Sequence, residues 1–519
     1  MNPFSSKRDA KDVCDFCLIS LWNTPVSINP LYHFVRKSLN EITSEEIKNR
    51  LRKINPNIKI SNDEESILRY QIKYPCAPAL LALAAVLEKK YNVRILSLDV
   101  EKEKYGSENW LSKVVDSISR NTKYGVLISI VSTEVTQLFK FSSLLKKNKK
   151  ELKIVVGGVH ATYNDVELLE NSNIDYVIRG EGEQTIVELC DAIANQLDVK
   201  NIRGVSFIQN EELIRTQDRS FIDLDELPIP AYHYVEDFID KIVVTTMFAR
   251  GCPYKCDYCA ESAFWSSNVR YKNIQKFVDE LELLATKYNQ RFIHIADSTF
   301  GINREKLKQL CDELEKRKIE AFFSINIRPN VLEYMGEEML LRLKKLNFVE
   351  MYMGVESADP KVISSLNRNV NNTNLIETLT KIKRIGIPFI KLYLMIGSPI
   401  DSRISFEKTV AFIESLLDNE LIFYATCKYF VPAIGSNIFK DIDKESKLHK
   451  DSIRLDRYNS PPLHIPQNTI AQEMDLYLQL LQVVQYKYYL KRCDESTRVR
   501  LKNEWEKFVL EHYYLGHYF

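Results

Sequence analysis

Short runs of β-branched and other apolar residues alternate with longer helical patterns along the first part of the chain. The expected strands cover residues 16–20, 93–97, 125–130, 153–156 and 176–178. Helices are expected at residues 77–90, 108–120, 134–147, 163–171 and 184–195. Strands that alternate with helices of this length are typical of βαβ units and a parallel sheet. The pattern therefore predicts an open α/β domain over residues 1–200, with a charged, partly helical insertion at 30–72.

A second alternation of strands and helices begins near residue 243. Strands are expected at residues 243–246, 292–296, 321–325, 349–354, 389–395 and 422–428. The helices between them are expected at residues 273–288, 303–318, 336–346, 359–366, 373–385 and 404–418. Six such repeats predict a partial version of the eight-stranded βα barrel, whose chemistry lies at the carboxyl ends of the strands.

Beyond the barrel pattern, two amphipathic helices are expected at residues 468–492 and 495–511. The predicted organisation is therefore an α/β domain, a linker, a partial barrel and a helical C-terminal region. Their expected boundaries are 1–200, 201–240, 241–440 and 441–519.

The composition of the chain adds few constraints. Its 519 residues are 45% hydrophobic and 27% charged, which is ordinary for globular domains. The net charge of +1 gives no indication of a nucleic-acid partner. The N-terminus has no apolar signal region, and no apolar stretch of about 18 residues predicts a spanning helix. A cytoplasmic protein without a membrane span is expected.

Cys252, Cys256 and Cys259 form the most informative motif, directly after the first strand of the second alternation. Three thiolates at Cys-x-x-x-Cys-x-x-Cys spacing can bind three irons of a 4Fe–4S cluster. Such clusters normally take four cysteines, so the fourth iron is left open for chemistry. Zinc, disulfides and buried structural cysteines are the alternatives. A structural zinc ion is usually bound by four ligands in two separated pairs, and no second pair follows here. Disulfides are not expected, because the ten cysteines are otherwise scattered in a chain without a secretory signature.

The segment Ala249–Glu261 resembles the radical S-adenosylmethionine (radical SAM) superfamily, with Arg250-Gly251 before the first cysteine and Tyr258 before the third. The resemblance implies that the open iron chelates the amino and carboxylate groups of SAM, and that one electron from the cluster splits its carbon–sulfur bond. Gly354-Val-Glu-Ser357 also resembles the superfamily's Gly-x-Glu-Ser segment, whereas its usual Gly-Gly-Glu is absent. The residues that the resemblance suggests as SAM contacts are Tyr258, Asp297, Ser324, Arg328, Glu356 and Gly397. Any one of the polar residues among them could instead cap a helix.

The strand ends of the first domain are small, polar or rich in glycine. Ligands of open α/β sheets bind beyond the carboxyl ends of the strands, and glycine lets the backbone approach a bulky ligand closely. Besides Asn23–Pro25, the candidate ligand contacts at these ends are Ser129, Ser132, Gly157, Gly158, Glu181 and Gly182.

The runs Val155–Ala161 and Asp175–Glu183 resemble the cobalamin-binding domain of the cobalamin-dependent radical SAM family. That domain is Rossmann-like, or more narrowly flavodoxin-like, and the resemblance covers about residues 13 to 440. The Asp-x-His-x-x-Gly motif of other cobalamin proteins is absent, and His160 is interpreted as a loop residue. A flavodoxin-like domain that is structural or binds substrate is the alternative.

The resemblance implies an enzyme that uses a 4Fe–4S cluster, S-adenosyl-L-methionine and cobalamin. The favoured reaction is methylation of an unactivated carbon in a natural product or peptide, with a flavodoxin- or ferredoxin-type electron donor. A rearrangement, cyclisation or ring contraction on the same scaffold is one alternative, and a non-catalytic iron–sulfur protein is another. Cys427 is interpreted as a buried structural cysteine, with a radical or proton donor as the alternative. The sequence indicates neither catalytic side chains nor the substrate.

Overall fold

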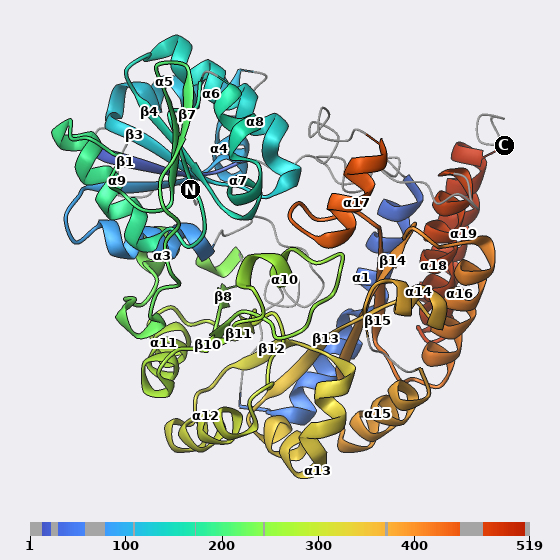
Figure 1. Cartoon of the computed structure of the whole chain (residues 1–519). Coiled ribbons are helices and arrows are strands. Elements are labelled where there is room, and N and C mark those ends of the chain that lie inside the picture. Colours follow the sequence, from blue (N-terminus) through green and yellow to red (C-terminus); the bar gives the residue numbers. More distant parts are fainter. Residues whose placement is uncertain are drawn as a thin grey trace. The chain divides into compact units, whose positions relative to one another are not determined.

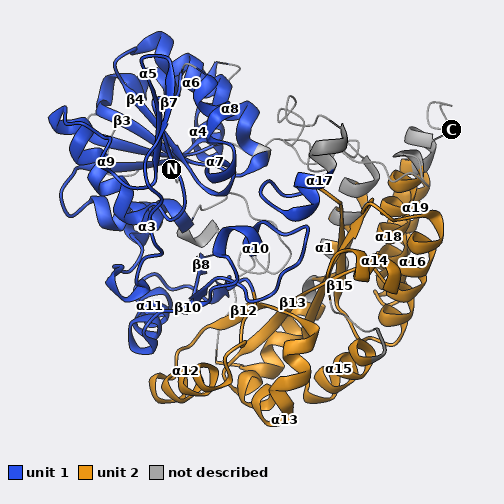
Figure 2. Cartoon of the chain, in the orientation of Figure 1, with its two compact units in different colours: residues 1–24, 72–298, 432–457 blue, residues 25–71, 299–431, 458–519 orange. Residues whose placement is uncertain are grey.

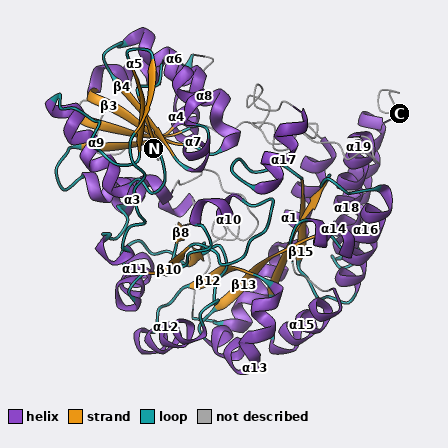
Figure 3. Cartoon of the chain, in the orientation of Figure 1, coloured by secondary structure: helices purple, strands orange, loops and turns teal. Residues whose placement is uncertain are grey.

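The computed structural model describes residues 13–21, 30–57, 78–106, 109–171, 173–241, 244–368, 372–446 and 471–513. The chain forms two compact units (Figure 2). The first contains residues 1–24, 72–298 and 432–457, and the second contains residues 25–71, 299–431 and 458–519. Strands and helices alternate through both units (Figure 1, Figure 3).

The first unit contains a seven-stranded sheet in the order β2-β1-β3-β4-β5-β6-β7. The first five strands pair in parallel, and the remaining pairings are antiparallel. The order 2-1-3-4-5 is that of flavodoxin-like folds, so the predicted fold class is confirmed. The strands are β1 Cys14–Ser20, β2 Val93–Ser97, β3 Thr122–Ser129, β4 Lys153–Gly157, β5 Tyr176–Ile178, β6 Val205–Gln209 and β7 Glu212–Arg215.

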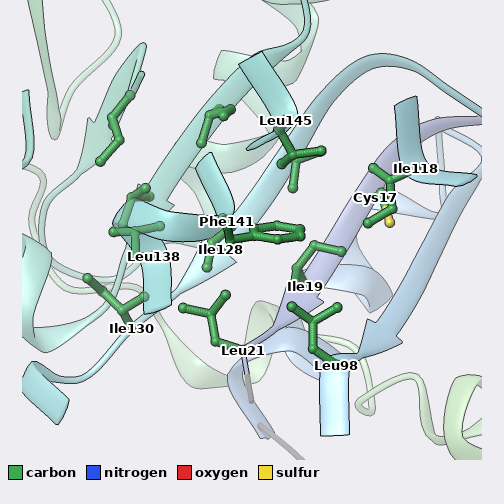
Figure 4. Packing of buried hydrophobic residues seen from close by; sticks show 14 of the residues in the cluster. Cys17, Ile19, Leu21, Leu98, Ile118, Ile128, Ile130, Leu138, Phe141 and Leu145 are labelled. Carbon is green, nitrogen blue, oxygen red and sulfur yellow. The ribbon is translucent and has the colours of Figure 1, made fainter. Parts of the chain in front are cut away.

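Helices cover both faces of this sheet, which explains why its central strands read as continuous apolar runs. On β1, Cys17 and Ile19 pack on one face with Phe141 (Figure 4), whereas Phe16 and Leu18 pack on the other with Leu80. The helices are α3 Pro78–Leu87, α4 Leu98–Tyr105, α5 Trp110–Asn121, α6 Val135–Asn148, α7 Val159–Tyr163, α8 Asp165–Glu170 and α9 Glu183–Asn195, with the 3₁₀ turn η1 Ser132–Glu134.

The rest of the first unit holds the cysteine motif. β8 pairs in parallel with β11, as expected for neighbouring barrel strands, and β9 pairs antiparallel with β10. The short β9–β10 ladder closes the loop that contains the three cysteines. The elements are η2 Leu224–Glu226, η3 Tyr232–Lys241, β8 Val244–Thr246, β9 Ala249–Arg250, α10 Ala260–Trp265, β10 Arg270–Tyr271, α11 Ile274–Thr286, β11 Phe292–Ile295 and α17 Asn437–Ser446.

The second unit is built on four parallel strands in the order β12-β13-β14-β15. They are β12 Phe322–Ile327, β13 Phe348–Glu356, β14 Phe389–Ile396 and β15 Tyr424–Tyr429. The helices between and beyond them are α12 Arg304–Arg317, α13 Pro329–Lys345, α14 Pro360–Ser365, α15 Asn372–Ile385, α16 Arg403–Asp418, α18 Ala471–Leu490 and α19 Glu495–Tyr513. The backbone of α13 is interrupted at Gly336, where φ is +77°.

The predicted insertion contains helix α1 Pro30–Ile54, which belongs to the second unit. Phe34 of α1 packs on the rings of Tyr486, Trp505 and Phe508 from α18 and α19. Arg50 donates a hydrogen bond of 2.8 Å to the carbonyl of Pro388. This helix therefore interrupts the first unit in sequence but folds with the second.

None of the helices in the described ranges is both long and apolar enough to cross a membrane.

Candidate functional site

The cysteine loop, residues 251–260, leaves β9 at a backbone position that suits glycine. Gly251 has a φ of +106°, and a Cβ placed there would lie 2.9 Å from the carbonyl carbon of Asn268 and closer still to its oxygen. Cys252 and Cys256 are buried, and Cys259 is half-buried. The amide of Cys259 donates to the carbonyl of Cys256 at 3.2 Å, which keeps the second half of the motif compact.

The donor set of this loop fits an iron–sulfur cluster. No disulfide bond joins any of the nine cysteines in the described part of the chain, so the disulfide alternative finds no support there. In the described residues no three Cys, His, Asp or Glu side chains converge on a point that could hold one metal ion. A cluster binds each cysteine through a different iron, so its three thiolates need not converge. The three thiols of the loop are the ligands that such a cluster would need.

Asp297 belongs to the same unit and contacts the backbone just before the cysteine loop. Its Oδ1 accepts hydrogen bonds from the amides of Phe248 and Ala249, at 2.8 and 2.9 Å. Burial raises the pKa of Asp297 to about 7. The structure thus gives this carboxyl a role in holding the strand that leads into the loop, in addition to the SAM contact predicted for it.

In the second unit, Glu356 ends β13 with a φ of +68°, a conformation that non-glycine residues adopt mainly at functional or tightly packed positions. Arg368 lies 3.2 Å from Glu356 Oε1 and also donates to the carbonyl of Gly354. A Cβ on Gly354 would meet the Arg368 guanidinium at 2.6 Å. Sequence reasoning missed Arg368, because no local pattern indicates that it pairs with Glu356, twelve residues earlier in the chain.

The loop after β14 is organised by Asp401, a second residue that the sequence did not single out. Asp401 Oδ2 accepts from the amides of Gly397 and Ser398, both at 2.9 Å. Burial raises the pKa of Asp401, although hydrogen bonds from Ser405 and Ser398 oppose that shift. The other two candidates belong to β12 and the residue after it: Ser324 is half-buried inside β12, and Arg328 is buried at the start of α13. Their predicted contacts with SAM stay predictions.

The carboxyl ends of β3 and β4 bring four of the other candidates together. Ser129 is the register partner of Gly157, and the Gly157 carbonyl accepts from the amide of Ile130 at 2.9 Å. Gly158 has a φ of +105°. Ser132 Oγ lies 3.0 Å from His160 Nδ1. The predicted segment Asn23–Pro25 lies outside the described residues.

Thr162 connects this edge to the loop after β5. Its hydroxyl donates to the carbonyl of Gly158 at 2.9 Å and accepts from the amide of Gly180 at 3.0 Å. A Cβ on Gly180 would have no heavy atom within 4 Å, so the backbone there is open. Open backbone beside glycines suits a large planar ligand. Sequence reasoning missed Thr162.

His160 is a buried imidazole in helix α7 rather than the loop residue that the sequence predicted. It is 1% exposed, and its Nε2 has no hydrogen-bond partner among the described residues. Burial lowers the pKa of His160 to about 4. The side chain is therefore neutral near pH 7.

The buried His160 predicts a loss of stability in mild acid. An unfolded histidine has a pKa of 6.5, so between pH 6.5 and about 4 the unfolded chain binds the additional proton. Stability should fall by about 2 kcal/mol between pH 7 and pH 5 from this residue. His160→Asn should flatten the pH dependence of the melting temperature of metal-free protein over that range. If the melting temperatures of the two proteins depended equally on pH, this would contradict the interpretation of His160 as a buried, neutral imidazole.

Glu181 and Gly182, the remaining candidates, follow β5. The Glu181 carboxylate faces the cysteine loop. Glu181 Oε1 lies 2.8 Å from Arg250 Nη1 and 2.9 Å from Arg270 Nη2, and Oε2 accepts from the amide of Ile222 at 2.9 Å. Burial opposes ionisation, but hydrogen bonds from Arg270 and Arg250 hold the pKa of Glu181 below its usual value. The loop after β5 and the start of the cysteine loop are thus joined by ion pairs within one unit.

Two family models match the chain. The Radical SAM superfamily model matches residues 246–413, and the B12 binding domain model matches residues 74–190. The first range contains the cysteine loop and all the candidate SAM contacts, and the second contains all the described candidates at the first sheet.

The chain is also similar to several named proteins. It is 25% identical over 345 residues to the uncharacterized methyltransferase PH0819 of Pyrococcus horikoshii, covering 65% of this chain and 72% of the relative. It is 20% identical to the cytidylyl-2-hydroxyethylphosphonate methyltransferase of Streptomyces wedmorensis, covering 78% and 86%. The anaerobic magnesium-protoporphyrin IX monomethyl ester cyclase of Cereibacter sphaeroides is 27% identical, covering 49% and 43%, so this match spans less than half of that relative.

Among solved structures, the cobalamin-dependent S-adenosylmethionine radical enzyme OxsB with aqua-cobalamin bound has a TM-score of 0.64. Its sequence identity is 13%, and the match covers 89% of this chain and 76% of that chain. This likeness supports the fold.

Proposed function

Because the chain joins a B12-binding domain to a radical SAM domain, and so belongs to the cobalamin-dependent radical SAM family, we propose that it methylates an unactivated carbon atom of its substrate. The structural observation that supports the joint use of two cofactors is the direct ion pairing of Arg250, at the start of the cysteine loop, with Glu181 of the loop after β5. A carbon methylation that draws on two cofactors requires both to be held close to the substrate.

The three cysteines are assigned to three irons of the cluster, and the residues after the barrel strands to SAM. The chemistry that the bound groups supply is one-electron cleavage of SAM and transfer of a methyl group through cobalamin. The protein contributes position and exclusion of water. In the second unit, Arg368 fixes the carboxylate of Glu356, and Asp401 fixes the backbone of Gly397 and Ser398.

Cobalamin is assigned to the carboxyl edge of the first sheet. Gly157 and Gly158 lie partly exposed there, and Ser129 and Ser132 carry hydroxyl groups at the same edge. His160 is assigned to hold Ser132 in place, because its Nδ1 already pairs with that hydroxyl. No Asp-x-His-x-x-Gly histidine is present for the lower face of cobalt.

The substrate is assigned to the class of natural products or peptides, and the electron donor to the flavodoxin or ferredoxin type. The methyltransferase names of PH0819 and of the phosphonate enzyme support methyl transfer. An oxygen-sensitive cluster favours a reducing compartment, and therefore the cytoplasm.

The proposal is tested by anaerobic reconstitution with iron, sulfide and hydroxocobalamin, followed by desalting and metal analysis. We expect about four irons and about one cobalt per chain. Replacing Cys252, Cys256 and Cys259 together by alanine should remove the iron and leave the cobalt unchanged. Iron without cobalt in the wild-type protein would refute the cobalamin-borne methylation.

The cyclase relative favours a second candidate, a cyclisation or rearrangement on the same scaffold. The products derived from SAM separate the two reactions. Methylation should give S-adenosylhomocysteine together with 5′-deoxyadenosine, whereas the second candidate should give 5′-deoxyadenosine without S-adenosylhomocysteine. A protein that forms neither product under reducing conditions would be a non-catalytic iron–sulfur protein.

A further inference from the structure

We propose that Glu181 is a positioning residue that ties both flanks of the cysteine loop to the cobalamin-binding domain, so that binding of cobalamin is sensed at the iron–sulfur cluster. The inference rests on the proposed function, because it needs cobalamin at the carboxyl edge of the first sheet. It adds a route of communication between the two cofactors that runs through side chains of one unit.

The first flank is held by Arg250, two residues before Cys252. One guanidinium nitrogen of Arg250 lies 2.8 Å from Glu181 Oε1, and the other lies 2.6 Å from Glu183 Oε1. Glu181 lies in the turn between Gly180 and Gly182, and Glu183 is the first residue of α9. A shift of this turn would therefore displace the entry to the cysteine loop.

The second flank is reached through Arg270. Its two terminal nitrogens lie 3.0 and 2.9 Å from the two oxygens of Glu181, which is a bidentate pair with defined orientation. The Arg270 guanidinium carbon lies 4.6 Å from the centre of the Phe221 ring and 5.4 Å from that of Trp265. Arg270 is thus fixed by a carboxylate and by aromatic rings.

Trp265 carries the connection to the residues after Cys259. Its Nε1 donates to Glu261 Oε2 at 2.7 Å, and Ser298 donates to the same oxygen. Glu261 lies in the first turn of α10, which begins one residue after Cys259. The series Glu181, Arg270, Trp265 and Glu261 therefore ends at the last cysteine of the motif.

The middle of the cysteine loop has a separate attachment to the same domain. Asn437 Nδ2 donates to Asp257 Oδ1 at 2.8 Å, and the amide of Ile438 donates to the carbonyl of Asp257 at 3.0 Å. Gly435, just before them, lies against Tyr163 at the end of α7, where a Cβ would meet the ring at 2.7 Å. Because α7 follows Gly158, the loop is linked to two strand ends of the cobalamin-binding domain.

The burial of these charges indicates a role beyond packing. The side chain of Glu181 is 5% exposed, and those of Arg250 and Arg270 are 16% and 17% exposed. A buried ion pair often stabilises a fold no better than apolar packing, but in some proteins it specifies one arrangement of its partners. A defined arrangement of Glu181, Arg250 and Arg270 would fix the cysteine loop relative to the loop after β5.

The test measures hydrogen–deuterium exchange of residues 250–265 in protein that carries the cluster, with and without hydroxocobalamin. We expect cobalamin to slow exchange in this segment at least threefold in the wild-type protein. Glu181→Gln should keep iron and cobalamin but lose the slowing, because a neutral amide cannot accept from both guanidiniums as the carboxylate does. The midpoint potential of the cluster is measured in the same samples. It should shift on addition of cobalamin only in those proteins in which cobalamin also slows the exchange.

Asp165→Asn is the matched control. Asp165 is a carboxylate of the same domain, 1% exposed, that pairs with Arg215 at 2.5 Å and accepts from Ser206 at 2.5 Å. This variant should keep the full response to cobalamin. Trp265→Phe retains the ring beside Arg270 but removes the bond to Glu261, so it should lose the response at residues 259–265 alone.

The outcomes separate the inference from the proposed function. Wild-type protein that retains no cobalamin would refute both. Cobalamin retained without any change in exchange or potential would overturn the inference alone, as would a Glu181→Gln variant that responds like wild type. A Glu181→Gln variant that loses cobalamin would make Glu181 a direct ligand contact and would also overturn the positioning role.

Discussion

Gly251→Ala is expected to abolish assembly of the iron–sulfur cluster. Gly251 has a φ of +106°, and an added Cβ would lie 2.9 Å from the carbonyl carbon of Asn268 and closer to its oxygen. The strained backbone alone would cost about 1–3 kcal/mol. The contact with backbone atoms cannot be relieved by a side-chain rotation, so the start of the cysteine loop must move. Iron should fall from about four to fewer than one per chain after anaerobic reconstitution.

A matched control for this variant is Gly106→Ala. Gly106 also has a positive φ, +52°, but the nearest atom to its added Cβ is the carbonyl oxygen of Glu103 at 3.9 Å. This control should keep its iron, and both variants should keep the cobalamin that the wild-type protein binds. A Gly251→Ala protein with full iron content would show that the loop tolerates another entry geometry.

Gly158→Ala is expected to have the opposite effect, with loss of cobalamin and retention of iron. Gly158 has a φ of +105°, and its added Cβ would lie 3.0 Å from the amide nitrogen of Ile130 and closer to the carbonyl oxygen. The two strand ends would therefore have to separate at the edge assigned to cobalamin. Retention of hydroxocobalamin after desalting should fall at least tenfold, measured from the cobalt content and the visible absorption.

Iron content serves as the internal reference for the Gly158 variant, because the cysteine loop is linked to Gly158 only indirectly, through Tyr163 of α7 and Gly435. Far-ultraviolet circular dichroism should show that the variant remains folded. Unchanged cobalt in Gly158→Ala would remove this edge from the cobalamin site. Loss of both metals would indicate that the substitution unfolds the unit as a whole.

The features that could be predicted from the sequence are those whose signal is local. The cysteine motif is contained in eight residues, and buried parallel strands such as β4 and β14 appear as short apolar runs. The hairpin β6–β7 was not predicted, because its strands are short, β6 is exposed in its second half and β7 is exposed along most of its length. The same local reasoning predicted a partly helical insertion at 30–72, in which α1 Pro30–Ile54 lies. It did not show that Phe34 and Arg50 dock this helix on the second unit.

The connections between the candidate residues could not be predicted, because they depend on pairs that are distant in sequence. Arg250 and Arg270 lie 69 and 89 positions from Glu181. In the sequence, Glu181 stands in a glycine-rich strand end and looks like a ligand contact. In the structure its carboxylate is held by two arginines. Arg368 and Asp401 likewise gain their significance only through the backbone and side chains that they fix.

The order in which the ribosome produces the chain bears on when the cluster can be inserted. Asp257, between the second and third cysteines, is held by Asn437, which is made 180 residues later. The second unit likewise combines α1, near the start of the chain, with α18 and α19 near its end. Both units need residues beyond 430, so neither unit can be completed before that part of the chain has been synthesised. Iron and sulfide that reach the chain before residues 437 and 438 have been made would accordingly meet a cysteine loop that lacks this support.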